Sequence, residues 1–204
     1  MLSPQSPAQE IVRVMSFYRR KASGLAQAAL LGANTFREWE HYPRHDARDH
    51  AHGTEFYYHA HAANERLRHE HGHFHVFSRP EANGSFVHLV GISLDPHGLP
   101  LRLFLTNRWV TGESWVSAAS ARQHIRRFCF KGRGPLAPLG DWVTSMVHLY
   151  RHDIEALHDA RDQWTKMRSP QFPSREALLE SRRYQVIAQR RVQLLQRLAQ
   201  EIAD

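Results

Sequence analysis

Residues 68–77 of this 204-residue chain read RHEHGHFHVF, and histidine occupies every second position from His69 to His75. In an extended strand, alternate side chains point to the same face of the sheet. The spacing therefore predicts a β-strand that carries four imidazoles on one face. Histidine is not a strong strand former, and its polar ring is not favoured in an apolar core. This face therefore calls for a functional explanation.

A second strand with histidines precedes this one in the chain. Residues 55–61 read EFYYHAH, and a period of two places Tyr57, His59 and His61 on one face. If the two strands pair antiparallel, their histidines share a face of the sheet, where opposed Cβ atoms lie about 4.5–5.5 Å apart. We therefore expect imidazoles from the two neighbouring strands to converge.

The remaining sequence predicts a third and a fourth strand and flanking helices. Ser6-Pro7-Ala8-Gln9 has the residues of a capping box, at the start of a helix expected within residues 5–33. Residues 54–108 are expected to form the sheet, with the turn sequence DPHG joining its last two strands. Residues 116–203 have helical periodicity that glycines and prolines interrupt.

These segments predict a single domain over residues 1–204 with an α+β fold. The expected sheet is antiparallel, has about four strands and bears a histidine-rich face, with one helix before it and three helices after it. The sequence EWEHYPRHDARDHAHG, at residues 38–53, has no clean period. We expect an ordered polar loop there.

The composition narrows the class of protein. The single cysteine, Cys129, excludes a disulfide framework and a thiolate-rich metal site. We expect no signal peptide and no membrane span, because no basic segment followed by a long apolar run opens the sequence and no stretch approaches about 18 apolar residues. The net charge is +7, but the sequence contains no motif of a known nucleic-acid-binding protein. We expect a cytoplasmic protein that acts on a small molecule rather than on nucleic acid.

The strand histidines are candidate metal ligands. Ten of the 16 histidines lie between positions 41 and 75, and the predicted ligands among them are His59, His61, His71, His73 and His75. With no cysteine nearby, the ligand atoms would be nitrogen and oxygen, which favours zinc or iron and also suits manganese, nickel or copper. Alternation along the strand places Glu70 on the opposite face.

A metal-dependent enzyme, hydrolytic or oxidative, is the leading hypothesis from this pattern. A divalent ion activates water or polarises an oxyanion, and a carboxylate such as Asp46 or Asp49 would accept the proton. The plain alternative is a polar face whose histidines make ordinary hydrogen bonds and bind no ligand.

Two local resemblances point to different chemistries. Residues 71–77, HGHFHVF, resemble the histidine-triad signature of nucleotide hydrolases and transferases, with Gly72 at one of its hydrophobic positions. That resemblance implies that the middle histidine, His73, is the nucleophile that attacks a phosphate. Residues 59–65 resemble the His-x-His-(x3)-Glu core of the first cupin motif, which implies that His59 and His61 bind a metal together with Glu65.

Four motifs together resemble an uncharacterised family of bacterial proteins. They are EHYP at residues 40–43, YYHAH at 57–61, EHGHFHVF at 70–77 and LRLFLTNRWVTGE at 101–113. The resemblance covers most of the span from position 38 to 150. It implies no activity, because the function of that family is unassigned.

Two further segments predict other roles. Arg108 and Trp109 follow the last expected strand and would hold an anionic or planar ligand through charge and stacking, or else anchor the neighbouring helices. Residues 174–203 predict one amphipathic helix with a basic face. That helix would bind a partner protein, or it would join two copies of the chain into a homodimer through their C-terminal parts.

Overall fold

The computed structural model describes residues 5–33, 35–79 and 84–203, and an antiparallel sheet organises them. Its strands follow sequence order, each paired with the next: β1 (Tyr42–Asp49), β2 (Thr54–His59), β3 (Gly72–Ser78), β4 (Val87–Leu94), β5 (Pro100–Thr106) and β6 (Val186–Arg191). The α-helices are α1 (Pro7–Arg20), α2 (Leu25–Ala29), α3 (Arg108–Thr111), α4 (Ala118–Arg127), α5 (Ala137–Leu149), α6 (Arg151–Arg168), α7 (Arg175–Leu179) and α8 (Leu194–Ala203), and short 3₁₀ turns span Gly134–Leu136 and Ser169–Gln171. None of the helices in the described ranges is both long and apolar enough to cross a membrane.

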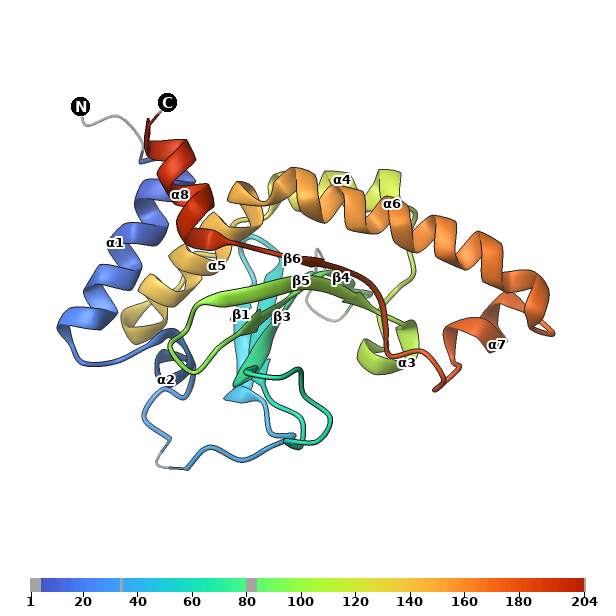
Figure 1. Ribbon diagram of the computed structural model, residues 1–204, viewed down its shortest axis with the longest axis horizontal. Helices are drawn as coiled ribbons and strands as arrows, with labels where there is room; N and C mark the ends of the chain where they lie inside the picture. The colour runs from blue at the N-terminus through green and yellow to red at the C-terminus, as the bar shows by residue number, and fades with distance from the viewer. Residues whose placement is uncertain (1–4, 34, 80–83, 204) are drawn as a thin grey trace.

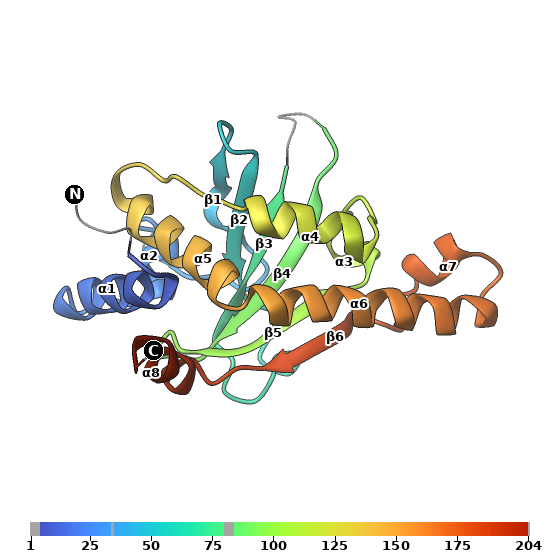
Figure 2. The same ribbon diagram turned by 90° about the horizontal axis from the view of Figure 1, so that it is seen from above.

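Helices cover one face of the sheet. Figures 1 and 2 show α4, α5 and α6 laid across it, with α1 beside α5 and α8 next to α1. Under these helices lies the apolar core, which includes Phe56, Phe74, Val76, Ile92 and Trp142. The strand members of this core alternate with the histidines of β2 and β3, so the imidazoles lie on the opposite face.

The structure confirms the predicted α+β class, with six strands in the described chain rather than about four and with more helices. The capping box forms as predicted: the Ser6 hydroxyl accepts from the backbone N–H of Gln9, and the Gln9 side chain accepts from the backbone N–H of Ser6. The single helix expected within residues 5–33 divides into α1 and α2. The division follows Ala22, whose left-handed φ of 48° is incompatible with a continuing helix.

The predicted turn between β4 and β5 is also confirmed. One carboxylate oxygen of Asp95 accepts hydrogen bonds from the backbone N–H groups of His97 and Leu99, each at 2.8 Å. Gly98 supplies the left-handed φ of 82° that closes the turn. The two strands consequently pair antiparallel.

Strand β1 lies in the segment that we expected to be a polar loop, residues 38–53. Its pairing with β2 slips in register between Tyr42 and Ala47, and Asp46 in this stretch has a left-handed φ of 53°. Such a bulge adds residues to one strand only. It removes the period of two by which a strand is predicted from sequence.

Strand β6 lies in the part of the chain that we expected to be helical, residues 116–203. The helix expected over 174–203 does not form; α7, β6 and α8 take its place. β6 pairs with β5, whose edge would otherwise present unpaired backbone groups. Leu194 and Leu198 of α8 are buried while Leu195 and Ile202 are exposed, so partner binding by this helix stays a prediction.

Gly91 in β4 makes room for an aromatic ring on the histidine face. A Cβ atom added to Gly91 would lie 2.3 Å from Cζ of Phe104, so this ring crosses directly over the glycine. The centroid of the Phe104 ring lies 5.3 Å from that of His73 and 5.7 Å from that of His75. The glycine therefore allows β5 to place an apolar side chain against the imidazoles.

We predict that Gly91→Ala lowers the free energy of unfolding by about 1–3 kcal/mol, because the added methyl group overpacks the Phe104 ring. Urea unfolding would measure the loss, and adding Phe104→Leu to Gly91→Ala should recover part of it. Gly24→Ala is the control, since its Cβ atom would meet only the flexible Gln27 side chain, at 3.1 Å. Equal losses for the two glycine variants would contradict the assignment.

Candidate metal centre

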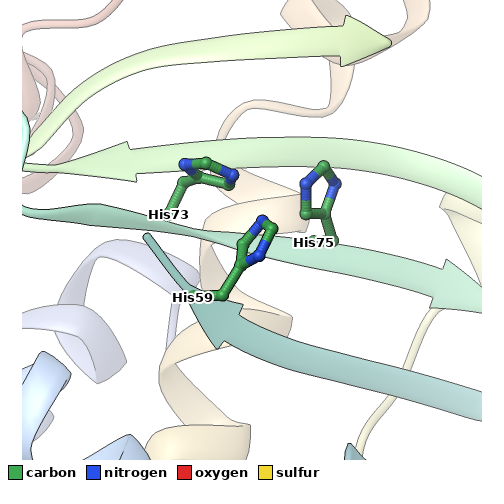
Figure 3. A group of neighbouring side chains, drawn as sticks. All are labelled: His59, His73 and His75. Atoms are coloured by element: carbon green, nitrogen blue, oxygen red, sulfur yellow. The ribbon is translucent and has the colours of Figure 1, made fainter. Parts of the chain in front are cut away.

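Three imidazoles converge on the face of the sheet that the helices leave uncovered. His59 ends β2, His73 and His75 belong to β3, and His59 lies directly opposite His73. One ring nitrogen from each of the three lies within 4.8 Å of the other two. Figure 3 shows the rings gathered on one side of their two strands. We refer to these three residues as the imidazole cluster.

His61 stands beside the imidazole cluster, just past the end of β2. Its ring centroid lies 5.0 Å from that of His59 and 5.1 Å from that of His73. On its other sides, the Trp39 ring stacks on it at 4.4 Å and the Gln185 amide nitrogen lies 3.3 Å from its Nδ1 atom. These contacts hold the predicted ligand His61 beside the imidazole cluster rather than in it.

The imidazole cluster is buried, and some of its nitrogen atoms have no partner. His59, His73 and His75 are 7%, 4% and 1% exposed. Nε2 of His59 and Nε2 of His73 have no hydrogen-bond partner among the described residues. Leaving a buried polar atom unpaired costs about 1–3 kcal/mol. A metal ion would remove this cost by accepting the lone pairs of these atoms.

Glu70 fixes the orientation of His73. One of its carboxylate oxygens accepts a hydrogen bond from Nδ1 of His73 at 2.7 Å, and both side chains are buried. A carboxylate only accepts, so Nδ1 carries the proton and Nε2 keeps the lone pair that a metal needs. Carboxylates commonly orient metal-bound histidines in this way.

The expectation that Glu70 points away from the histidines was wrong. Alternation applies only within an extended strand, and β3 begins at Gly72. Before it, His69 has a left-handed φ of 70°, which turns the chain and brings the Glu70 side chain back over His73. The residue order alone carries no signal of this turn.

His88 is a second residue that supports the cluster, and the sequence did not single it out. Its Nε2 atom lies 3.0 Å from Nδ1 of His75, which leaves Nε2 of His75 free for a ligand. His88 belongs to β4, opposite Phe77 on β3, and its backbone N–H donates to Glu113 at 3.0 Å. The sequence places His88 in a predicted strand, but it does not predict which residue of β3 lies opposite His88.

Burial keeps His59, His61, His75 and His88 neutral near pH 7. Desolvation is the largest cause in each case: it lowers the pKa of His59 to about 2, that of His61 to about 4 and that of His88 to about 3. Burial also lowers the pKa of His75 well below its ordinary value. Neutral imidazoles present lone pairs, which is the state that binds a metal.

The structure does not bring His71 to the cluster. Its ring packs against Phe36 and Tyr58 on the core side of the sheet, and its Nδ1 atom lies 2.6 Å from the Tyr58 hydroxyl. Gly72 makes this contact possible, because a Cβ atom there would lie 2.7 Å from the same hydroxyl oxygen.

The predicted proton acceptor Asp46 reaches the cluster indirectly. One of its carboxylate oxygens lies 3.0 Å from Nδ1 of His41. The His41 ring stacks on Tyr57 with centroids 3.6 Å apart and stands edge-on to His59 at 5.6 Å. Asp46 and His41 therefore form a pair at the margin of the imidazole cluster.

The second predicted acceptor, Asp49, lies at the other end of β2, where it is opposite Thr54. Its carboxylate accepts hydrogen bonds from the backbone N–H groups of His52 and Lys131 and contacts the His52 ring. These contacts close the β1–β2 turn and hold Asp49 away from the cluster.

Arg108 and Trp109, the predicted ligand-binding pair, contact the segment before β6. Nε of Arg108 donates to Glu180 at 2.8 Å, and Nε1 of Trp109 donates to the carbonyl oxygen of Tyr184 at 2.7 Å. These contacts correspond to the anchoring alternative. The next residue of the same helix, Val110, is the one that lines the cavity beside the histidines.

One cavity adjoins the imidazole cluster, and a larger pocket lies at its margin. A small cavity of about 50 Å³ lies against His61, His73 and His75. A larger pocket of about 680 Å³ is lined by His41 and Asp46, among others. The first adjoins possible ligands directly, and the second adjoins the acid–base pair at the margin.

Comparison with known protein families finds a match over most of the chain. The sequence profile of a family described as a domain of unknown function, DUF6969, matches residues 5–192, which include the whole sheet and the cluster. This match agrees with the resemblance to an uncharacterised family. No curated protein and no solved structure was found to match the chain.

We predict that the metal-free protein loses stability on acidification. The unfolded chain takes up protons at histidine below about pH 6.5, whereas His59, His88 and His158 have pKa values of about 2, about 3 and about 3 in the fold. The unfolded state then binds more protons, so stability falls as the pH drops from about 6.5 towards about 4. Each such histidine contributes a slope of about 1.4 kcal/mol per pH unit.

Urea unfolding in the presence of a chelator, at several pH values across this window, would measure the slope. His158→Gln should reduce it by about one proton, since that imidazole is fully buried. His97→Gln, in the exposed β4–β5 turn, is the control and should leave the slope unchanged. An unchanged slope in His158→Gln would count against burial as the cause.

Proposed function

The chain belongs to the DUF6969 family, a domain of unknown function, and from its site we propose that it binds a divalent metal and uses it in catalysis. The observation that carries the proposal is the buried convergence of His59, His73 and His75, with ring nitrogens within 4.8 Å of one another. Zinc–nitrogen bonds are about 2.0–2.1 Å long, so modest ring rotations would bring all three nitrogens onto one ion. Zinc or iron suits this nitrogen set best, and manganese, nickel and copper also fit it.

The number of ligands favours a catalytic rather than a structural ion. Structural zinc sites are closed by four protein ligands, whereas catalytic sites typically have three and keep a position open. The imidazole cluster offers three, and His61 is held by Trp39 and Gln185 outside it. The ion would therefore activate water, or polarise an oxygen of a small-molecule substrate. Zinc would direct this site to hydrolysis, and iron to oxidation.

The residues around the ion have distinct tasks. Glu70 and His88 hold the Nδ1 sides of His73 and His75, so that both Nε2 atoms face a common point. His41, paired with Asp46, stands edge-on to the His59 ring and is placed to accept a proton at the margin of the larger pocket. Asp46 thus remains the proposed carboxylate of the mechanism, acting through His41.

Metal analysis of the untagged protein tests the proposal. The wild type is expected to retain a stoichiometric divalent metal after dialysis, and His73→Gln to lose it, because that change removes a ligand. His71→Gln is the matched control: it lies in the same HGHFH segment, but its ring faces the core. Circular dichroism would verify folding, and equal metal content in the two variants would contradict the proposed ligand set.

We further predict that Glu70→Gln weakens metal affinity by about 10–100-fold without abolishing binding, since it removes the charged acceptor for His73. Competition with a coloured chelator would measure the affinity. Glu176→Gln, the same change at an exposed carboxylate on α7 that does not line the cavity, should leave the affinity within about twofold of wild type. A Glu70→Gln protein that binds metal as tightly as wild type would contradict the orienting role.

The resemblance to the histidine-triad enzymes predicts a different chemistry at the same residue. With His73 as a nucleophile, a nucleoside phosphoramidate would be turned over in excess chelator. The metal proposal expects no such turnover. It is favoured because His73 shares its site with His59 of another strand, which the triad signature leaves without a role.

A further inference from the structure

A divalent ion at the proposed site would bring positive charge into the interior of the protein. His59, His73 and His75 bind a metal only as neutral groups, so the ion would keep its full double charge. The buried carboxylate that touches the cluster is Glu70, and Arg102 lies 3.5 Å from its second oxygen. Burying a charge without compensation is costly. An anion from outside the chain would supply that compensation at the open position of the metal.

The space beside the histidines limits the size of such an anion. The cavity has a volume of about 50 Å³, whereas an engineered cavity of about 150 Å³ binds benzene, a ligand of six heavy atoms. His61, His73 and His75 line it, together with the apolar side chains of Phe104, Val110 and Val186. The cavity therefore accommodates a ligand of about three heavy atoms or fewer.

The charged residues that line the cavity are Arg66, Arg102, Glu65 and Glu70, so their charges balance and a divalent ion would make the cavity positive. Thr106 is 2% exposed, and its hydroxyl has no hydrogen-bond partner among the described residues although it lines the cavity. Arg102 lines it as well and brings a positive charge, while its own donors are directed to Ser93 and Gln189. A hydroxyl free to donate, beside a guanidinium and a metal ion, is an arrangement that stabilises negative charge.

We propose that this cavity is the exogenous-ligand pocket of the metal and that it takes a small anion of about three heavy atoms or fewer, with Thr106 as a recognition residue. The inference rests on the proposed metal site and names the ligand class of its open position. Hydroxide is the smallest such anion; azide and formate are larger examples that still fit.

Azide titration of the cobalt-substituted full-length protein tests the proposal, with the visible absorption of cobalt as the readout. Azide is expected to shift the spectrum saturably. Thr106→Val should weaken azide binding about tenfold, because it removes a hydrogen bond to a charged ligand. Thr165→Val is the matched control: its buried hydroxyl donates to the carbonyl oxygen of Arg161 within α6 at 2.9 Å, so azide affinity should not change.

A second variant tests the size of the pocket rather than its polarity. Val186→Phe fills the cavity from a half-buried position on β6. It should abolish the azide response while cobalt content stays at the wild-type level. In the wild type, formate should compete with azide and benzoate should not. Benzoate competing as well as formate, or azide affinity unchanged in both cavity variants, would overturn the assignment.

The same experiment separates this inference from the function on which it rests. A protein that binds no cobalt would overturn the proposed metal site, and the inference with it. Stoichiometric cobalt with a spectrum that azide leaves unchanged would overturn the inference alone and leave the metal site standing.

Discussion

The register in which β2 pairs with β3 is the constraint on which the rest of the structure depends. His59 lies opposite His73, and Phe56 lies opposite Val76. The first pair faces the imidazole cluster and the second faces the apolar core under the helices. Because side chains alternate, a slip of one residue would move the histidines of one strand into the core and its aromatic residues onto the other face. Core packing and site geometry therefore specify the same register.

Burial of the imidazoles is costly, and the surrounding residues limit this cost without removing it. Glu70 and His88 satisfy one nitrogen on each of two rings, but Nε2 of His59 and Nε2 of His73 have no partner in the part of the chain that the structure describes. Desolvation lowers the pKa of His59 to about 2, so protonation offers no relief near neutral pH. A bound metal would satisfy these atoms together. The features that weaken the metal-free fold are those that prepare it for a ligand.

One small cavity adjoins the cluster directly, and a larger pocket lies at its margin. The Phe104 ring lies over Gly91 and lines the small cavity. The volume of this cavity limits it to a small ligand. The larger pocket is lined by polar groups, His41 and Asp46 among them. In the proposed function, the small cavity holds an anion beside the ion, and the larger pocket presents His41 and Asp46 at the margin of the cluster.

The sequence by itself determined the strands β2 and β3, the face on which His59, His73 and His75 lie and the capping box at Ser6, because each depends on local periodicity or on contacts a few residues apart. The same periodicity was wrong for His69 and His71, which precede β3. Only the tertiary structure decided the rest. β6 is a strand because β5 offers it an edge far away in the chain. Glu70 and His88 reach the cluster through a left-handed turn and a cross-strand register, and local residue patterns encode neither.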